Sequence, residues 1–209
     1  MKIIIIVNGE NSKVTSLPSI VSKADYIIAA DGGIFNCLEN NIEPDFIIGD
    51  LDSIKTEELS LNKKTEIIQI KEQNSTDLEK AIEYARKFNP SVIDIFCSFG
   101  KRMDHALGNV FILNNYSDLQ INMHDSWGTM FAINPGIRVF SGLKGTTVSL
   151  FAFSQIEKLT LNGFEFPLEK ETIGPSFLGV SNRIVKDKAS IEFDKGRLLV
   201  YQIRDEGNK

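Results

Sequence analysis

The first half of the chain carries short apolar runs separated by longer mixed segments. Five of these runs are bounded by polar or turn residues, and they cover residues 2–7, 26–30, 46–49, 66–70 and 92–97. Runs of this length that are rich in isoleucine are typical of β-strands. Because most of them lack the alternation of a half-exposed strand, we expect strands that are covered on both faces.

Helical patterns lie between the apolar runs. The clearest begins at a possible capping box of Thr76 and Glu79 and ends at Asn89-Pro90. Residues 32–41 and 104–116 are the other candidates for helices. Strands that alternate with helices in this way predict an α/β fold, with a mostly parallel sheet, flanking helices and right-handed crossovers.

The pattern changes after about residue 125. Short alternating segments follow one another there, with turn signals at Asn162-Gly163 and at residues 194–196. This part predicts antiparallel β-structure, in the form of a small sandwich or barrel. We therefore expect two domains, an N-terminal α/β domain of residues 1–126 and a C-terminal antiparallel β-sandwich domain of residues 127–209.

Composition narrows the class of partner. The 209 residues carry a net charge of -5, and a surface that follows a phosphate polymer needs clustered Lys and Arg, so we expect no nucleic acid partner. The N-terminal apolar run reaches Asn8-Gly9 too early for the core of a signal peptide, and no segment is apolar enough for a membrane span. We expect a cytoplasmic protein whose two cysteines, Cys37 and Cys97, are reduced and buried.

Polar residues follow every one of the five predicted strands. In an open parallel sheet the carboxyl ends of the strands share one edge, and ligands bind along it. In chain order, the strands are followed by Asn8-Gly9; by Asp31, Gly32 and Gly33; by Asp50 and Asp52; by Gln73 and Asp77; and by Gly100, Lys101, Arg102, Asp104 and His105.

Carboxylates dominate this predicted edge. Taken singly, Asp77 is explained as a charge in the first turn of a helix, Asp104 as an N-cap and Asp52 as part of an Asx turn. Together they require another explanation, because neighbouring carboxylates repel one another unless a cation lies between them. Oxygen ligands without a His/Cys set favour Mg²⁺, so Asp50 and Asp52 are expected to share this ion.

The phosphate contacts are less sharply indicated. The chain has neither of the common glycine-rich phosphate-binding signatures. Gly32-Gly33 before a helix would offer amides to phosphate, or would let the helix pack closely. Lys101-Arg102 would face phosphate, or would form a surface ion pair with Asp104. His105 is expected to support or cap the site rather than to act as its base.

Five segments resemble the thiamin pyrophosphokinase family, whose members move a pyrophosphoryl group from ATP to thiamin. They are AADGG (29–33), PDFIIGDLDS (44–53), STDLEKA (75–81), GKRMDHALGN (100–109) and LGVSN (178–182). The likeness covers essentially the whole chain, in order. It implies that residues 1–126 form a nucleotide- and magnesium-binding catalytic domain and that residues 127–209 form a thiamin-binding domain. It also implies a homodimer, with thiamin in a cleft at the subunit interface.

The resemblance also gives roles to individual residues. Catalytic roles are implied for Asp50, Asp52, Asp77, Asp104 and Arg102, the first three as magnesium ligands. Nucleotide contacts or their support are implied for Asp31 and Asn109, and thiamin contacts for Gln73, Ser181 and Asn182. Gly32, Gly33, Lys101 and His105 are expected at the nucleotide site from their positions after the strands. Lys101 stands where the family commonly has glycine, and Arg183-Ile184 replaces an acidic–hydrophobic pair.

The expected reaction is attack of the thiamin hydroxyl on the β-phosphorus of ATP, with AMP as the leaving group. Alignment and stabilisation of charge on the phosphate oxygens would carry the catalysis. Asp77 and Asp104 are both candidates for the base. Three alternatives stay open: a pyrophosphokinase for another heteroaromatic alcohol such as a hydroxymethylpterin, a non-catalytic nucleotide- or thiamin-binding module, and a Mg²⁺-dependent phosphohydrolase.

Overall fold

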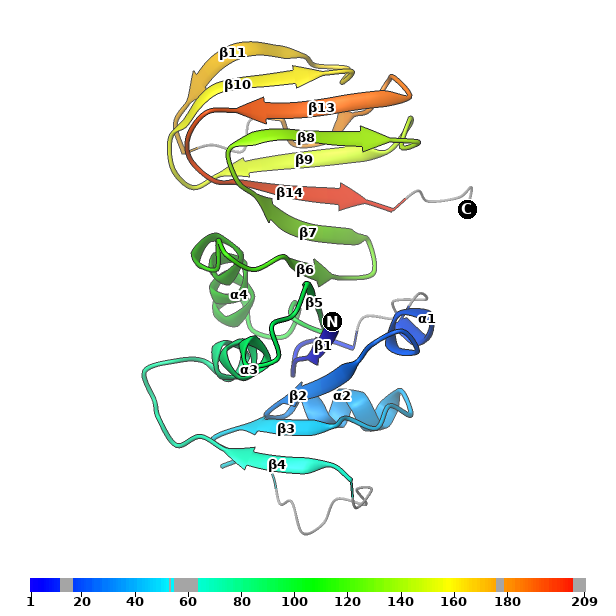
Figure 1. The fold of residues 1–209 in the computed structure, drawn as a ribbon, viewed down its shortest axis with the longest axis vertical. Helices are drawn as coiled ribbons and strands as arrows, with labels where there is room; N and C mark the ends of the chain where they lie inside the picture. Colours follow the sequence, from blue (N-terminus) through cyan, green and yellow to red (C-terminus); the bar gives the residue numbers. More distant parts are fainter. Residues whose placement is uncertain (12–16, 53, 55–63, 176–178, 205–209) are drawn as a thin grey trace. The chain divides into compact units, whose positions relative to one another are not determined.

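The computed structural model describes residues 1–11, 17–52, 54, 64–175 and 179–204, which fold into two compact units (Figure 1). The first unit comprises Met1–Ile112 and Asp118–Ser126, and the second comprises Leu113–Ser117 and Trp127–Lys209. Ser53 and Leu178, which belong to two of the quoted motifs, lie outside the described residues.

The first unit contains a parallel sheet of six strands. Their order across the sheet is β6 (Ile121–His124), β5 (Val92–Phe96), β1 (Lys2–Ile6), β2 (Tyr26–Ala30), β3 (Phe46–Gly49) and β4 (Glu66–Gln69). The five predicted strands are confirmed. The sixth, β6, is short and did not stand out as an apolar run.

Helices connect these strands, as the alternating pattern predicts. They are α1 (Leu17–Val21), α2 (Gly33–Glu39), α3 (Asp77–Arg86) and α4 (Met103–Asn115). The capping box is confirmed: Thr76 Oγ1 accepts from the Glu79 N–H, and the Glu79 carboxylate accepts from the Thr76 N–H at 2.8 Å. These bonds satisfy two backbone donors at the helix start, so α3 begins at a defined residue, Asp77.

Strand coverage differs between the centre and the edge of this sheet. Residues Ile3–Ile6 of β1 are at most 1% exposed, as expected for a strand with neighbours on both sides. The same expectation is wrong for β4, where Ile67 is 45% exposed. The reason is that β4 is the edge strand of this sheet, and among the described residues it pairs with β3 alone.

One charged residue is buried within the central strands. Asp94 of β5 accepts hydrogen bonds from Lys2 Nζ at 2.9 Å, from His124 Nε2 at 2.8 Å and from Asn122 Nδ2 at 2.9 Å. Burial raises the pKa of Asp94, but the hydrogen bonds from His124, Asn122 and Lys2 outweigh it and hold the pKa at about 2. Asp94 is therefore ionised inside the sheet and links β5 to β1 and β6.

The second unit consists of two antiparallel sheets. One contains β12 (Asn182–Arg183), β9 (Thr147–Ala152), β14 (Leu198–Ile203) and β7 (Gly128–Ile133), and the other contains β11 (Leu168–Ile173), β10 (Ile156–Asn162), β13 (Lys188–Phe193) and β8 (Gly136–Ser141). The antiparallel β-structure expected after residue 125 is confirmed.

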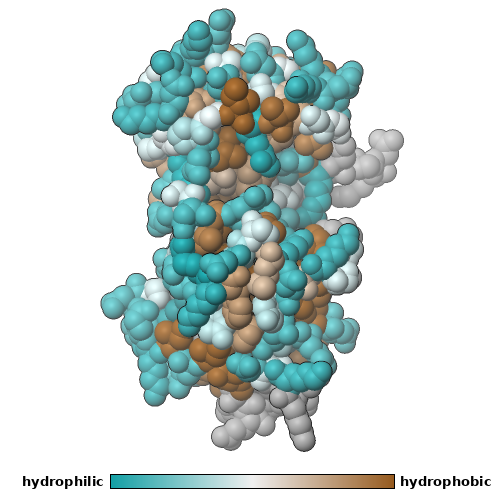
Figure 2. Space-filling model, in the orientation of Figure 1, coloured by the Kyte–Doolittle hydropathy of each residue, from teal (hydrophilic) through white to brown (hydrophobic). Residues whose placement is uncertain are grey.

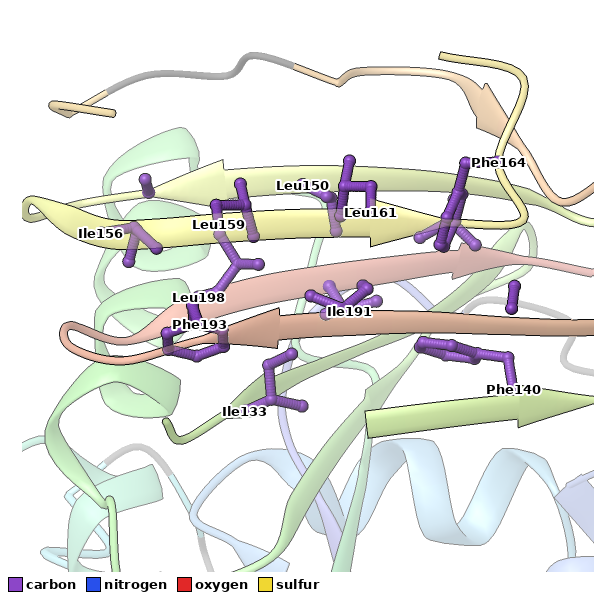
Figure 3. Close-up of a cluster of buried hydrophobic side chains, with 14 of the residues drawn as sticks. Ile133, Phe140, Leu150, Ile156, Leu159, Leu161, Phe164, Ile191, Phe193 and Leu198 are labelled. Carbon is purple, nitrogen blue, oxygen red and sulfur yellow. The ribbon is translucent and has the colours of Figure 1, made fainter. Parts of the chain in front are cut away.

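Side chains from both sheets form the core of this unit. Figure 3 shows Leu150 and Leu198 of one sheet beside Leu159, Ile191 and Phe193 of the other, and all are at most 1% exposed. The turn signals are also confirmed, because Gly163 and Gly196 both adopt left-handed backbone conformations, with φ of 78° and 100°. Apolar burial between two sheets is therefore the main source of stability here.

The visible surface is largely hydrophilic, with small groups of hydrophobic side chains between the polar ones (Figure 2). Within the described ranges, no helix combines the length and the apolar composition that a membrane crossing requires.

Candidate active site

The predicted functional edge of the first unit contains a cavity of about 550 Å³. Residues after β1, β2 and β5 line it, together with the first turns of α3 and α4. Seven of the predicted site residues are among them: Asp31, Asp77, Lys101, Arg102, Asp104, His105 and Asn109. The parallel topology thus brings together residues that are far apart in the sequence.

Several loops at this edge have strained backbone. Asp31, Leu51, Cys97 and Lys101 follow β2, β3 and β5, and all four have positive φ values between 42° and 62°. Holding a non-glycine residue at positive φ is energetically unfavourable, and residues in this conformation are common at functional sites. Lys101 has a φ of 54°, a left-handed backbone conformation that glycine adopts more easily than lysine. This explains why glycine suits the position in the family that the sequence resembles.

Asp50 is held at the carboxyl end of β3 by two hydrogen bonds. Its carboxylate accepts from the Asp52 N–H at 3.3 Å and from Gln73 Nε2 at 3.2 Å. These bonds lower the pKa of Asp50, the Asp52 bond most, and the charge of Lys80 contributes further. Gln73 thus supports Asp50, and its predicted contact with thiamin stays a prediction.

Asp77 is the first residue of α3, and a lysine of the same helix, Lys80, neutralises its charge. Its Oδ1 atom lies 3.1 Å from Lys80 Nζ, and the Lys80 side chain is only 3% exposed. Lys80 was missed by the sequence analysis. The three-residue spacing of the pair is a visible signal, but such pairs also occur on exposed helix faces.

The proposed magnesium ligands do not form a closed cluster. Within the described part of the chain, no three side chains of the Asp, Glu, His or Cys type are grouped as they would be around an ion. The donor chemistry nevertheless fits Mg²⁺, because Asp50, Asp52 and Asp77 offer carboxylate oxygens at one edge of the sheet. Their role as ligands stays a prediction.

Arg102 and Asp104 pair with each other at the cavity. Arg102 Nε and an Nη atom contact the two oxygens of Asp104 at 3.1 and 2.5 Å. The pair holds the pKa of Asp104 at about 2, mainly through the Arg102 hydrogen bonds. The surface ion pair is thus the arrangement observed, and Asp104 lies within the first turn of α4 rather than at its N-cap, which is Arg102.

Two further polar residues fix the loops around the cavity. Lys101 Nζ donates to the backbone and side-chain oxygens of Asn8 at 3.0 and 3.1 Å, which ties the end of β5 to that of β1. Asn109, 8% exposed, donates to the Ser98 carbonyl at 2.6 Å. Asn109 therefore supports the loop before α4, whereas His105 is exposed in its first turn.

Gly32 and Gly33 are buried where α2 meets β1. A Cβ atom on Gly33 would lie 2.0 Å from the Ile6 carbonyl oxygen, and one on Gly32 would lie 2.2 Å from the Asn8 side chain. The close helix packing that the sequence left open is therefore observed. Their contact with the nucleotide stays a prediction.

The predicted thiamin residues of the second unit have different surroundings. Ser181 is exposed with φ of 58°, and its N–H donates to Ser149 Oγ at 2.9 Å. Asn182 is 1% exposed, and its amide makes two hydrogen bonds with the backbone of Phe166, at 3.0 and 2.9 Å. Asn182 therefore fixes the backbone of Phe166, a residue that is 65% exposed and that no signal in the sequence singled out.

Comparison with known proteins bears on the whole chain. The sequence model of one protein family, the thiamin pyrophosphokinase catalytic domain, matches residues 17–124, which is more than half of the chain. The chain belongs to the thiamin pyrophosphokinase family. The model of the vitamin B1 binding domain of thiamin pyrophosphokinase matches residues 136–198. The family expected from the sequence motifs is confirmed.

Individual members of the thiamin pyrophosphokinase family are similar along their full length. Thiamine pyrophosphokinase of Bacillus subtilis is 29% identical over 96% of this chain and 98% of its own. Its crystal structure matches with a TM-score of 0.83 over 98% and 100% of the two chains. The Geobacillus thermodenitrificans enzyme matches with a TM-score of 0.85 at 25% identity, over 99% of each chain.

Proposed function

We propose that this chain carries out the reaction for which its family is named, transfer of the pyrophosphoryl group of ATP to the hydroxyl of thiamin, giving thiamin diphosphate and AMP. The observation that carries the proposal is the match of both family domains, in order, over residues 17–124 and 136–198. The cavity at the strand ends of the first unit, with its carboxylates and cations, offers the chemistry that this reaction needs.

The first unit is proposed to bind ATP and magnesium. Asp50, Asp52 and Asp77 would hold Mg²⁺, which when bound neutralises charge on the phosphate oxygens. Lys101 and Arg102 line the cavity and would bind the triphosphate. Arg102 uses Nε and one Nη atom on Asp104, so its remaining N–H groups would bind phosphate, or the whole guanidinium would leave Asp104 to do so. The remaining nucleotide contacts proposed are Asp31, Gly32, Gly33, His105 and Asn109.

Asp77 and Asp104 are both proposed as candidates for the base, and each is paired with a cation, Asp77 with Lys80 and Asp104 with Arg102. A carboxylate with a pKa near 2 accepts a proton poorly at neutral pH, and Arg102 keeps Asp104 in that state. If Arg102 moves to phosphate, this restraint on Asp104 is released. Positioning of the hydroxyl in line with the β-phosphorus is the larger contribution in either case.

The second unit is proposed to bind thiamin. Ser181 is exposed and would contact the substrate directly, whereas buried Asn182 would act through the exposed ring of Phe166. An aromatic face suits a cationic heteroaromatic substrate. We also propose the homodimer that the family resemblance implies, with thiamin at the subunit interface. Light scattering of the purified protein measures its mass, and the mass of a single subunit would contradict the dimer.

A coupled assay of AMP release tests the function. With ATP and Mg²⁺, thiamin should support AMP formation, and a hydroxymethylpterin should not. Equal rates with the pterin would favour a different pyrophosphokinase. Ligand binding without AMP release under saturating Mg²⁺ would favour a binding module, and phosphate release without any acceptor would favour a phosphohydrolase.

Ser181→Ala should raise the KM for thiamin by about tenfold, as expected for the loss of one neutral hydrogen bond, with little change in kcat. Initial rates at saturating ATP measure this. The backbone N–H of residue 181 still donates to Ser149, so the loop should keep its conformation. An unaltered KM would mean that the Ser181 hydroxyl does not contact thiamin.

A further inference from the structure

The ammonium group of Lys80 is buried beside the proposed magnesium site. Lys80 is 4% exposed as a residue, and lysine is almost never buried this fully without a partner. Within the described part of the chain, its ammonium makes one hydrogen bond, to Asp77 Oδ1 at 3.1 Å. Because a buried charge is costly, the position of Lys80 depends on the negative charge of Asp77.

Lys80 lies behind Asp77 rather than in the cavity. Thr76, Asp77 and Leu78 of the α3 start line the cavity, whereas Lys80 lies one turn further along the helix and is not among the lining residues. The fixed positive charge of Lys80 therefore lies directly against one of the three proposed magnesium ligands.

We propose that Lys80 is a positioning residue that acts as a resident counter-cation of the magnesium site and makes the site select the metal–nucleotide complex over the free metal ion. This inference rests on the proposed function. A fixed positive charge repels a free divalent ion and weakens its binding. The same charge attracts the complex of the ion with ATP, which carries a net negative charge. Loss of Lys80 should therefore move the two affinities in opposite directions.

Mn²⁺ titration of the full chain, with free Mn²⁺ measured by electron paramagnetic resonance, tests this proposal. In Lys80→Met, which keeps an unbranched side chain one atom shorter and removes its charge, Mn²⁺ alone should bind about tenfold more tightly than in the wild type. The KM for Mg²⁺–ATP should rise severalfold in the same variant. Lys80→Arg keeps the charge and should restore both values toward those of the wild type.

Lys87→Met is the matched control. It removes the same charge from the exposed C-terminal end of α3, where Lys87 lies 4.5 Å from the centre of the Tyr84 ring. Both affinities should change by less than twofold. If Lys80→Met does not fold, Lys80→Gln makes the same change of charge with a side chain that can still hydrogen-bond to Asp77.

The outcomes separate the inference from the function on which it rests. If the neutral variant is folded but binds Mn²⁺ alone no more tightly, Lys80 only orients Asp77 or stabilises the helix, and the proposal is wrong. The magnesium site itself is tested by Asp50→Asn in the wild-type background. If that change leaves Mn²⁺ affinity unaltered, the proposed metal ligands are wrong, whatever Lys80→Met does.

Discussion

Asp50→Asn should lower turnover by roughly 10²- to 10³-fold while the melting temperature changes by only a few degrees. The neutral amide is a poor ligand for Mg²⁺ compared with the carboxylate, so the proposed metal site is weakened. The fold should persist, because Asp50 is only half-buried at the end of β3 and its carboxylate hydrogen-bonds to the loop residues Asp52 and Gln73. Initial rates at saturating ATP and thiamin, with a thermal melt of the same preparation, measure both effects.

Glu43→Gln is the control for this substitution. Glu43 is exposed just before β3, at the opposite end of the strand from Asp50, and the change removes the same charge. Turnover should stay within twofold of the wild type. A large loss of stability in Asp50→Asn with turnover retained would count against its catalytic role.

Asp94→Ala should lower the free energy of unfolding by about 3 kcal/mol, which is typical for breaking a buried ion pair. The substitution leaves the Lys2 ammonium without its Asp94 bond and removes the partner of His124 and Asn122. Urea unfolding followed by circular dichroism measures the effect. The folded fraction should keep its activity, because Asp94 lies within β5 and is not part of the cavity lining.

The hydrogen-bond network of Asp94 should also make the free energy of unfolding depend on pH in acid. The pKa of Asp94 is held at about 2, below its ordinary value near 4, so its contribution to stability is fully present above about pH 4. That contribution is lost as the pH falls through about 2, and Asp94→Ala should lack this part of the acid dependence.

Asp118→Ala, which removes an exposed ion pair with Arg86, is the control and should lower the free energy of unfolding by less than about 1 kcal/mol. Equal losses in the two variants would contradict the special role of Asp94.

The strands of the first unit were predicted from their runs of apolar residues. Continuous isoleucine-rich runs identified β1, β2, β3 and β5, because a strand covered on both faces has few polar positions. The same signal misjudged β4, since the chain does not encode locally which strand lies at the edge. The domain limits of 1–126 and 127–209 stay a proposal, although α4 contributes to both compact units.

The candidate site shows the same division between local and tertiary information. The order of strands and helices was sufficient to predict that Asp31, Asp77, Arg102 and Asp104 share one edge, because parallel strands deliver their carboxyl ends together. The partners of these side chains were not predictable. Gln73 supports Asp50, and Asn182 holds Phe166, through contacts between segments far apart in the sequence.

By itself the sequence determined the α/β and antiparallel β classes, the family and the set of acidic and basic residues at the strand ends, because periodicity and motif spacing are local properties of the chain. Only the tertiary structure decided that Lys80 is buried and that Gly32 and Gly33 serve close packing. These features depend on distances and on exclusion of water, and both arise only when separate segments pack together.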